Sequence, residues 1–419
     1  MSRDLVPLIV VAPVLIVPEA MPWLTAGVLA VFTPIALVRL FAARRATRLA
    51  WPAIGILVMA LVGTAVSPDR AVSVQKLAGI VLGALALAAV QVHARRAGGF
   101  AAAMIVFVVM ATLAVAASGA AALLPGVRRL LPARAALQRT VPAAIVHPNG
   151  VAGLILLAAP GLLVLSASRA VWVRAGSVLA PRARSRWTRP IVLRFGTAAI
   201  ALAMLATLVA SRSRSGVVGL LAAMVLVLAI RLVAGRASRR AWVAVSAALV
   251  VGAGAVVSMA IYTGSRLSED MATRADIWDR AAMMIAAFPL TGVGLNAFRS
   301  VMPLVAPSSH VSPAIDLAHA HNMFLQTALD LGLPGLCAYL ALLGAALASC
   351  VLVAGGKSPA RRDMALALAA NVAAINLFGL TDAVPLGSKV GLLFWISLGL
   401  VGALHARERE ARAFAGAHP

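Results

Sequence analysis

Residues 263–324 read TGSRLSEDMATRADIWDRAAMMIAAFPLTGVGLNAFRSVMPLVAPSSHVSPAIDLAHAHNMF, the longest polar-containing interval in a chain otherwise made of apolar runs joined by short basic loops. The interval carries five of the thirteen acidic residues: Glu269, Asp270, Asp276, Asp279 and Asp316. It also carries four arginines and three of the seven histidines: Arg266, Arg274, Arg280, Arg299, His310, His319 and His321. If the protein performs chemistry, we expect that chemistry in this interval.

The composition indicates an all-α polytopic membrane protein. Of 419 residues, 62% are hydrophobic and 12% are charged, and the mean hydropathy is +0.98. Soluble domains carry about 25% charged residues. Apolar runs of about 20 residues recur, and each is long enough to cross a bilayer as a helix. The first run lacks the basic start and cleavage site of a signal peptide, so we expect it to remain as a span.

Twelve apolar runs predict twelve transmembrane helices with one large loop late in the chain. Residues 1–262 hold spans one to nine, residues 263–324 form the loop, and residues 325–419 hold spans ten to twelve and a basic tail. The predicted spans are 5–20, 22–40, 50–66, 76–93, 99–118, 148–166, 191–210, 216–233, 241–262, 325–354, 363–381 and 387–404. Gly332, Pro334 and Gly335 predict a break near the start of the tenth.

The distribution of basic residues predicts the orientation. With a cytoplasmic N-terminus, 24 of the 37 Lys and Arg residues fall inside and 13 outside, which matches the positive-inside bias and puts both termini in the cytoplasm. The large loop then faces outward. The net charge of +24 is explained by these loops, so we expect no nucleic-acid partner.

Three groups of arginines remain on the outer side, against this bias. One is the stretch 128–139, which ends at Arg139 and is followed by His147; another is SRSRSG at 211–216, with Arg212 and Arg214; the third is the large loop. Arginine suits bidentate binding of phosphate, so these groups indicate a lipid-linked phosphate or pyrophosphate as ligand. Anchoring to lipid headgroups is the alternative, in particular for the stretch 128–139.

Within the large loop, residues 273–287 have apolar residues at helical spacing. Ile277, Ala281, Met284 and Phe288 would share one face, which predicts a helix whose apolar side lies on the membrane surface. On the other face, Asp276 and Arg280 are four residues apart and predict a salt bridge. Three prolines at 303, 307 and 313 then predict irregular, extended backbone.

The loop closes with AHAHN at 318–322 and runs directly into the tenth span. Histidine is the natural general base near neutral pH, and His321 lies at the start of the helix, where its ring can be aimed. His319 lies two residues earlier, in the predicted loop. A structural role as an interfacial histidine capping the helix is an alternative. Zinc would need three or four ligands at fixed spacing, and two histidines two residues apart do not supply them, so we predict no metal and no cofactor.

Four segments together resemble the O-antigen ligase family, related to the O-antigen polymerases. They are HPNG at 147–150, SRSRSG at 211–216, RADIWDRAAMMIAAFPLTGVGLNAF at 274–298 and HNMFLQTALDLGLPGL at 321–336. The order of these segments, about twelve spans and a late periplasmic loop also match. The resemblance covers roughly residues 145–340, and the earlier spans match only in hydropathy.

The resemblance implies a metal-independent glycosyltransferase of the GT-C type in the bacterial inner membrane, with its site on the periplasmic face. Such an enzyme moves O-antigen from undecaprenyl pyrophosphate to a hydroxyl of lipid A-core, with inversion. The family's histidine corresponds to His321 and its SR arginine to Arg214, with Arg212 as an alternative because SR is doubled. Its loop arginine corresponds to Arg274, with Arg266 as an alternative. We include Arg139 among the candidate donor-binding residues.

Two other functions remain open at this point. An O-antigen polymerase uses the same donor and a polymer acceptor. A flippase or transporter of lipid-linked oligosaccharide is also polytopic, but transporters place ionisable residues in mid-membrane. We find Arg194, Arg231, Asp330 and Asp382 only near the predicted span ends, which favours the transferase.

Overall fold

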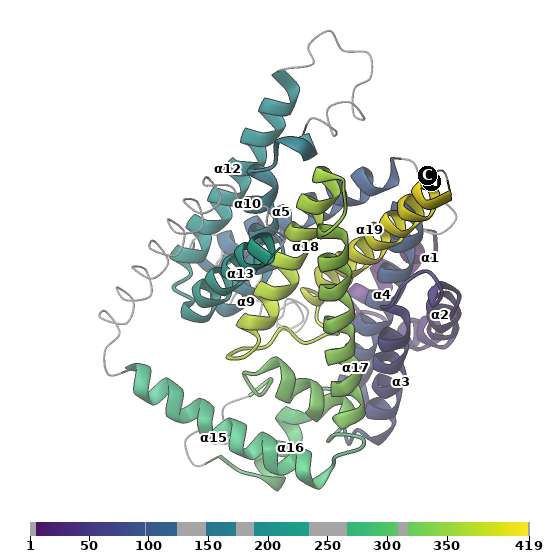
Figure 1. Cartoon of the computed structure of the whole chain (residues 1–419). Coiled ribbons are helices and arrows are strands. Elements are labelled where there is room, and N and C mark those ends of the chain that lie inside the picture. The colour runs from purple at the N-terminus through teal and green to yellow at the C-terminus, as the bar shows by residue number, and fades with distance from the viewer. Residues whose placement is uncertain are drawn as a thin grey trace. The chain divides into compact units, whose positions relative to one another are not determined.

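A computed structural model describes residues 6–96, 98–123, 148–172, 188–233, 266–308 and 317–417. Within these ranges the regular structure is helical (Figure 1). The first helices are α1 (Val6–Ile16), α2 (Pro22–Ala43), α3 (Ala50–Val66), α4 (Arg70–Arg95), α5 (Gly99–Leu123), α9 (Pro148–Leu156) and α10 (Ala159–Ser166). Then follow α12 (Thr188–Ala210), α13 (Arg214–Val233), α15 (Arg266–Ala287), α16 (Phe298–Val305), α17 (Met323–Ala354), α18 (Pro359–Phe378) and α19 (Gly391–Ala417).

Seven helical segments in the described ranges are long and apolar enough to cross a membrane. They are Pro22–Ala43, Arg70–Arg95, Gly99–Ala120, Asn149–Ser166, Ile191–Ala210, Arg214–Arg231 and Met323–Ala354. Helices α1 and α3 are apolar but shorter. The all-helical class is therefore confirmed for the described residues, and the seven segments are consistent with a multi-pass membrane protein. The number twelve stays a prediction, because the ninth predicted span at 241–262 lies outside the described residues and α1, α3, α18 and α19 are not among the seven.

The chain divides into two compact units. The first comprises Met1–Ala89, Ser258–Ala345 and Phe378–Ile396, and the second comprises Val90–Val257, Ala346–Leu377 and Ser397–Pro419. Segments distant in sequence thus form each unit. In particular, the segment before α17 and the segment after α18 fall in the same unit, which matters for the candidate site.

In the first unit, α17 breaks where its sequence predicts. Gly332 has φ +67° and ψ 176°, outside the helical region. A Cβ at this position would lie 2.3 Å from the carbonyl oxygen of Leu290, so only glycine fits the turn. The next residue, Leu333, donates its N–H to the carbonyl of Pro289 at 2.7 Å. The break therefore fastens α17 to the segment between α15 and α16.

A buried ion pair joins two helices of the same unit. Lys76 of α4 lies 2.5 Å from Oδ2 of Asp330 on α17, and both side chains are 6% exposed. Oδ1 of Asp330 accepts hydrogen bonds from Nε2 of Gln326 at 3.0 Å and from the N–H of Asn296 at 2.8 Å. Lys76 lies inside α4, which starts at Arg70. Burial of both charges is tolerated because they pair and the carboxylate is hydrogen-bonded.

The predicted helix of the large loop exists but starts earlier, at Arg266. Ile277, Ala281 and Met284 are at most 1% exposed and pack against Phe298 and Met302 of α16 in one apolar cluster. The prediction that this face lies on the membrane surface is therefore wrong, because the loop folds back and buries it (Figure 1). Irregular backbone was also wrongly predicted around Pro303, which lies inside α16.

The predicted salt bridge of the loop helix is confirmed. Nη2 of Arg280 lies 3.1 Å from Oδ1 of Asp276. The other carboxylate oxygen of Asp276 accepts a hydrogen bond from the hydroxyl of Ser308 at 2.5 Å. Asp276 thus ties α15 to the chain that follows α16.

In the second unit, the predicted sixth span is two short helices, α9 and α10, separated at residues 157–158. Gly161 lies in the first turn of α10, and its N–H donates to Oδ1 of Asn371 on α18 at 2.7 Å. A backbone donor that the helix start leaves without an intrahelical acceptor is thereby satisfied. Asp363 of α18 accepts from Ser168 at 2.6 Å and pairs with Arg231 of α13 at 3.1 Å.

Candidate active site

The candidate site of the first unit is built on the turn that precedes α17. Asn322 caps this helix, because its Oδ1 accepts the N–H groups of Phe324 at 2.9 Å and Leu325 at 3.1 Å. Its Nδ2 donates to the carbonyl of Leu380 at 2.9 Å, and Met323 N–H donates to that of Gly379 at 2.6 Å. The turn is therefore fixed to the segment that follows α18.

His321 lies in this turn with a φ of +48°, in the left-handed region that residues other than glycine rarely adopt. Such conformations cost of order 1–3 kcal/mol and cluster at functional sites. The His321 side chain is 28% exposed. The capped helix and the anchored turn hold the backbone in this strained conformation, so the direction of the imidazole ring is defined.

Asp382 lies beside His321, although 60 residues separate them in sequence. Its Oδ1 is 3.4 Å from Nδ1 of His321 and accepts the N–H of Ala383 at 2.8 Å. Asp382 is 4% exposed. Burial by itself raises the pKa of this carboxyl, but the contact with His321 and the charges of His319 and His321 outweigh burial and lower the pKa below its ordinary value. The carboxylate is thus ionised at neutral pH.

His319 contacts His321 directly. The two ring centroids are 4.6 Å apart at an interplanar angle of 69°, an edge-to-face arrangement. Nδ1 of His319 accepts the backbone N–H of His321 at 3.4 Å. Although the sequence places His319 in the loop before the helix, the fold makes it a direct neighbour of His321.

Helix α15 brings Arg274 to the same place. Nη1 of Arg274 donates to the carbonyl of Thr381, the residue before Asp382. One turn further along α15, Nε1 of Trp278 donates to the carbonyl of Ala320, the residue before His321, at 3.1 Å. Arg274 and the histidine turn are therefore held by the same helix.

Arg266 lies at the first position of α15. It is eight residues before Arg274, which corresponds to about 12 Å along a helix axis. Of these two candidate arginines, Arg274 is the one whose side chain the structure describes, and it contacts Thr381.

A series of hydrogen bonds between buried groups supports the histidine turn. The N–H of Ala320 donates to Oε1 of Gln326 at 2.9 Å. Gln326 donates in turn to Asp330, which pairs with Lys76. Because these groups are buried, each hydrogen bond removes a desolvation cost that the group would otherwise carry. The ion pair thus helps to hold the backbone between the two histidines.

The second arginine group lies in the second unit, in the turn between α12 and α13. Arg212 is exposed and has a φ of +56°, whereas Arg214 is half-buried at the first position of α13. The hydroxyl of Ser213 accepts the N–H of Gly216 at 3.2 Å and donates to Oδ1 of Asn149 at 2.8 Å. The SRSRSG and HPNG segments are therefore in contact. Arg139 and its neighbours in 128–139 lie outside the described residues.

His319, His321 and Asp382 also offer three possible metal-ligand atoms, all within 4.8 Å of one another. Zinc–ligand distances of about 2.0–2.1 Å put tetrahedral ligand atoms about 3.4 Å apart. The distance of 3.4 Å between Nδ1 of His321 and Oδ1 of Asp382 equals this spacing, so the geometry does not exclude a metal ion at these residues. The sequence analysis had found only two ligands, because the third comes from a distant segment, and a chelator now becomes a direct test of the metal-free prediction.

Two residues of the site, Asp382 and Gln326, were not among the predicted site residues. Asp382 had been noted only as an acid near a span end. One signal was available: it is one of thirteen acidic residues and lies between two predicted spans, on the side to which the large loop was assigned. Gln326 lies in an apolar helical stretch, and nothing in its sequence neighbourhood marks it.

The fold and the site together define a polytopic helical membrane protein with a polar histidine, aspartate and arginine site at a helix start. Residues 199–340 match the family model described as O-antigen ligase, which spans the SRSRSG turn, α15, α16 and the histidine turn. The resemblance to the O-antigen ligase and polymerase superfamily is thus confirmed over this region. It supports a glycosyltransferase-like function on lipid-linked polysaccharide. No curated protein matches the chain.

Proposed function

We propose that the protein is an O-antigen ligase of the bacterial inner membrane. It transfers O-antigen from undecaprenyl pyrophosphate to a sugar hydroxyl of lipid A-core, at a periplasmic site and with inversion. The observation that carries the proposal is the pairing of His321, which lies in the family-matched region 199–340, with Asp382, which follows α18.

The geometry of this pair supports a role for His321 as general base. Asp382 faces Nδ1, so the carboxylate favours the tautomer with a proton on Nδ1 and leaves the lone pair of Nε2 for the acceptor hydroxyl. As the acceptor oxygen bonds to the anomeric carbon, Nε2 takes its proton. The bond between that carbon and the pyrophosphate oxygen breaks at the same time, and the electron pair leaves with the pyrophosphate. A single displacement inverts the anomeric centre.

The arginines would stabilise the leaving pyrophosphate in place of a metal ion. Arg214 lies at the start of α13, where the helix dipole itself favours an anion and disfavours a cation. A bound phosphate would offset this unfavourable placement of the guanidinium. Arg274 is assigned the same role because it donates to the carbonyl of Thr381, next to the Asp382 that pairs with His321.

Transfer between purified components tests the proposal. The full chain is incubated with undecaprenyl-pyrophosphate-linked glycan and rough lipopolysaccharide, with and without EDTA. We expect ligation that EDTA does not inhibit. His321→Ala should lower the rate about 10²–10⁴-fold, the usual worth of general-base assistance. His319→Ala is the matched control and should retain substantial activity.

Several results would contradict this assignment. An active His321→Ala with an inactive His319→Ala would make the base assignment wrong. Inhibition by EDTA that zinc reverses would replace the metal-free mechanism with one at the three-ligand cluster. Longer glycan chains on the carrier lipid, without transfer to lipopolysaccharide, would identify a polymerase.

The proposed periplasmic face has its own test. A periplasmic reporter fused at Ser308 should be active, and one fused at Arg186 should be inactive. The opposite pattern would reverse the orientation of the chain and remove the large loop from the periplasm.

A further inference from the structure

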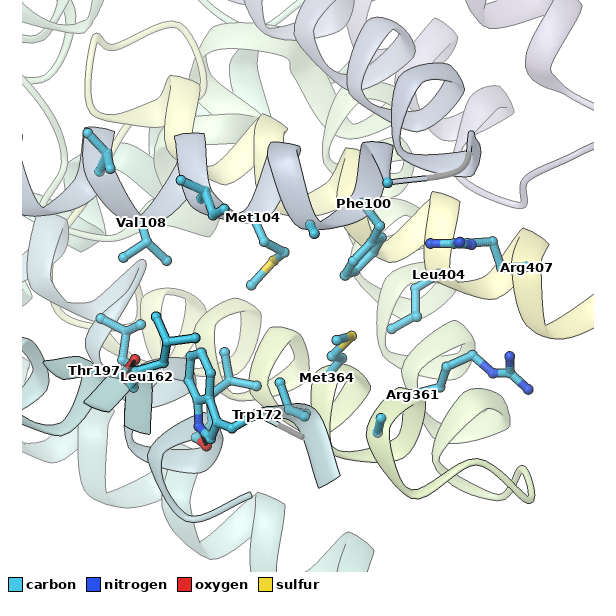
Figure 2. Close-up of a pocket in the computed structure, with 18 residues that line it drawn as sticks. Phe100, Met104, Val108, Leu162, Trp172, Thr197, Arg361, Met364, Leu404 and Arg407 are labelled. Atoms are coloured by element: carbon cyan, nitrogen blue, oxygen red, sulfur yellow. Dashed lines mark hydrogen bonds between the residues drawn. The ribbon is translucent and has the colours of Figure 1, made fainter. Parts of the chain in front are cut away.

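The second unit contains a cavity of about 480 Å³, separate from the residues of the candidate active site. It is lined by residues of α5, α10, α12, α18 and α19 and by the segment that contains Trp172 (Figure 2). Cavities of about 300–1,000 Å³ commonly hold small-molecule ligands. Nothing in the proposed transfer reaction uses this cavity, so its occupant must be argued from its walls.

Most of the wall is apolar. Phe100, Met104 and Val108 of α5 lie along one side, with Leu162 and Trp172 across from them (Figure 2). The polar atoms on this wall are already engaged. Nε1 of Trp172 donates to the carbonyl of Leu165 at 2.8 Å, and the hydroxyl of Thr197 donates to that of Leu193 at 2.8 Å. Such a wall suits a hydrocarbon chain better than a sugar.

Two arginines lie together at one end of the cavity, Arg361 of α18 and Arg407 of α19 (Figure 2). Nε of Arg361 donates to Oε2 of Glu408 at 2.8 Å, and the guanidinium has four further N–H donors on its terminal nitrogens. The carbon Cζ of Arg407 is 6.0 Å from the ring centroid of Phe100, where the apolar wall begins. Glu408 also pairs with Arg412, at 3.1 Å, so one carboxylate serves two arginines and the positive charge is in excess.

The cavity opens on a surface that is itself apolar. Ile105 and Val109 both line the cavity and are 47% and 49% exposed. Further exposed apolar side chains continue along the two candidate spans α5 and α12, among them Leu113, Val192 and Phe195. In a membrane protein these faces contact lipid. The bilayer is therefore the source from which a ligand enters the cavity.

We propose that the cavity binds an anionic glycerophospholipid from the bilayer, with one acyl chain along the apolar wall and the phosphate at Arg361 and Arg407. Basic pockets between transmembrane helices bind the headgroups of anionic lipids in this way. The distribution of basic residues in the sequence predicts that this end of the helices is cytoplasmic, where anionic headgroups attract basic residues. The lipid site is independent of the transferase proposal and stands on the cavity alone.

Quenching of Trp172 by brominated acyl chains tests this binding. The full chain is reconstituted in phosphatidylcholine vesicles that contain increasing fractions of phosphatidylglycerol brominated in the chains. Because the protein has seven tryptophans, the Trp172 signal is taken as the difference between wild type and Trp172→Phe. We expect the quenching of Trp172 to reach saturation at a low fraction of brominated phosphatidylglycerol. With brominated phosphatidylcholine, we expect the quenching to increase only gradually and without saturation.

Charge variants test the headgroup contact. Each basic residue near a membrane surface contributes about 1 kcal/mol of attraction to anionic lipid, so Arg361→Gln with Arg407→Gln should weaken the apparent affinity about 30-fold. Arg409→Gln is the matched control, because Arg409 is an exposed arginine on the same helix that does not line the cavity. It should change the affinity less than threefold.

Further variants keep the test decisive. If the double variant does not fold, Arg407→Gln alone decides, because it leaves the contact between Arg361 and Glu408 in place. Ala101→Phe should fill the cavity and abolish the saturable signal. Equal quenching by the two brominated lipids, or an unchanged double variant, overturns the proposal. Displacement of phosphatidylglycerol by equimolar undecaprenyl phosphate would assign the cavity to the carrier lipid instead and also overturn it.

Discussion

Asp382→Asn separates the charge of the carboxylate from its shape. Oδ1 of Asp382 both accepts the N–H of Ala383 and faces Nδ1 of His321. An amide oxygen in the same position would keep both contacts, so the Nδ1-protonated tautomer should persist while the negative charge is lost. The variant therefore measures how much the charge of Asp382 stabilises the imidazolium that forms when His321 takes the proton.

The size of the effect follows from the distance. Two unit charges 3.4 Å apart attract by about 5 kcal/mol at an effective dielectric constant of 20. Solvent reaches His321, which is 28% exposed, and the Asn dipole retains part of the interaction. We therefore expect a loss of about 1.4–2.8 kcal/mol in transition-state stabilisation, or about 10–100-fold in kcat.

Steady-state transfer with both lipid substrates provides the assay. Because Asp382 is buried against His321, kcat should fall while KM for the donor stays within twofold. Asp382→Ala also removes the control of the tautomer and should cost more than Asp382→Asn. Asp279→Asn, which neutralises an exposed acid on α15, is the matched control and should be silent. Wild-type kcat in Asp382→Asn would refute the reasoning.

The lowered pKa of Asp382 adds a dependence of stability on pH. A carboxyl whose pKa is lower in the folded state stabilises the fold at pH values above its unfolded pKa, and this contribution disappears as the pH falls through the folded value. The ordinary value for Asp382 is 3.8. The difference in thermal midpoint between wild type and Asp382→Asn should therefore hold from pH 7 to about 5 and close below about pH 4. A difference that grows on acidification would contradict the assigned direction.

Three further variants test the rest of the site. Arg214→Lys keeps the charge but loses the planar fork of the guanidinium, so ligation should fall at least tenfold with normal membrane insertion. Arg212→Lys, at the exposed position, should keep ligation within about twofold of wild type. Equal losses in the two variants would contradict the choice of Arg214 over Arg212. Arg274→Ala should raise the donor KM about tenfold, and an unchanged KM would remove Arg274 from the site. Gln326→Leu leaves the Ala320 N–H without its acceptor, so the unfolding free energy should fall by about 1–3 kcal/mol and kcat should fall with it; a stable, fully active variant would show that these hydrogen bonds do not position the turn.

The sequence predicted the helical segments well because apolar runs of this length have few other stable arrangements in a bilayer. It predicted the break at Gly332 and the salt bridge between Asp276 and Arg280 because both depend on residues within a few positions of each other. The sequence did not predict what covers the apolar face of the loop helix α15, which packs against α16. Periodicity shows that a face is apolar, but not whether lipid or protein covers it.

The sequence alone determined the resemblance to the O-antigen ligase and polymerase superfamily, the helical class and the choice of His321, Arg274 and Arg214 as candidate site residues. These conclusions rest on composition and on local motifs, which are properties of neighbouring residues. Only the tertiary structure decided that Asp382 faces His321, that His319 touches it, that Gln326 holds the turn and that Lys76 is buried against Asp330. The physical reason is that a charge acts across a few ångströms of space, and residues 61 or 254 positions apart in the chain come within that range only when the helices pack.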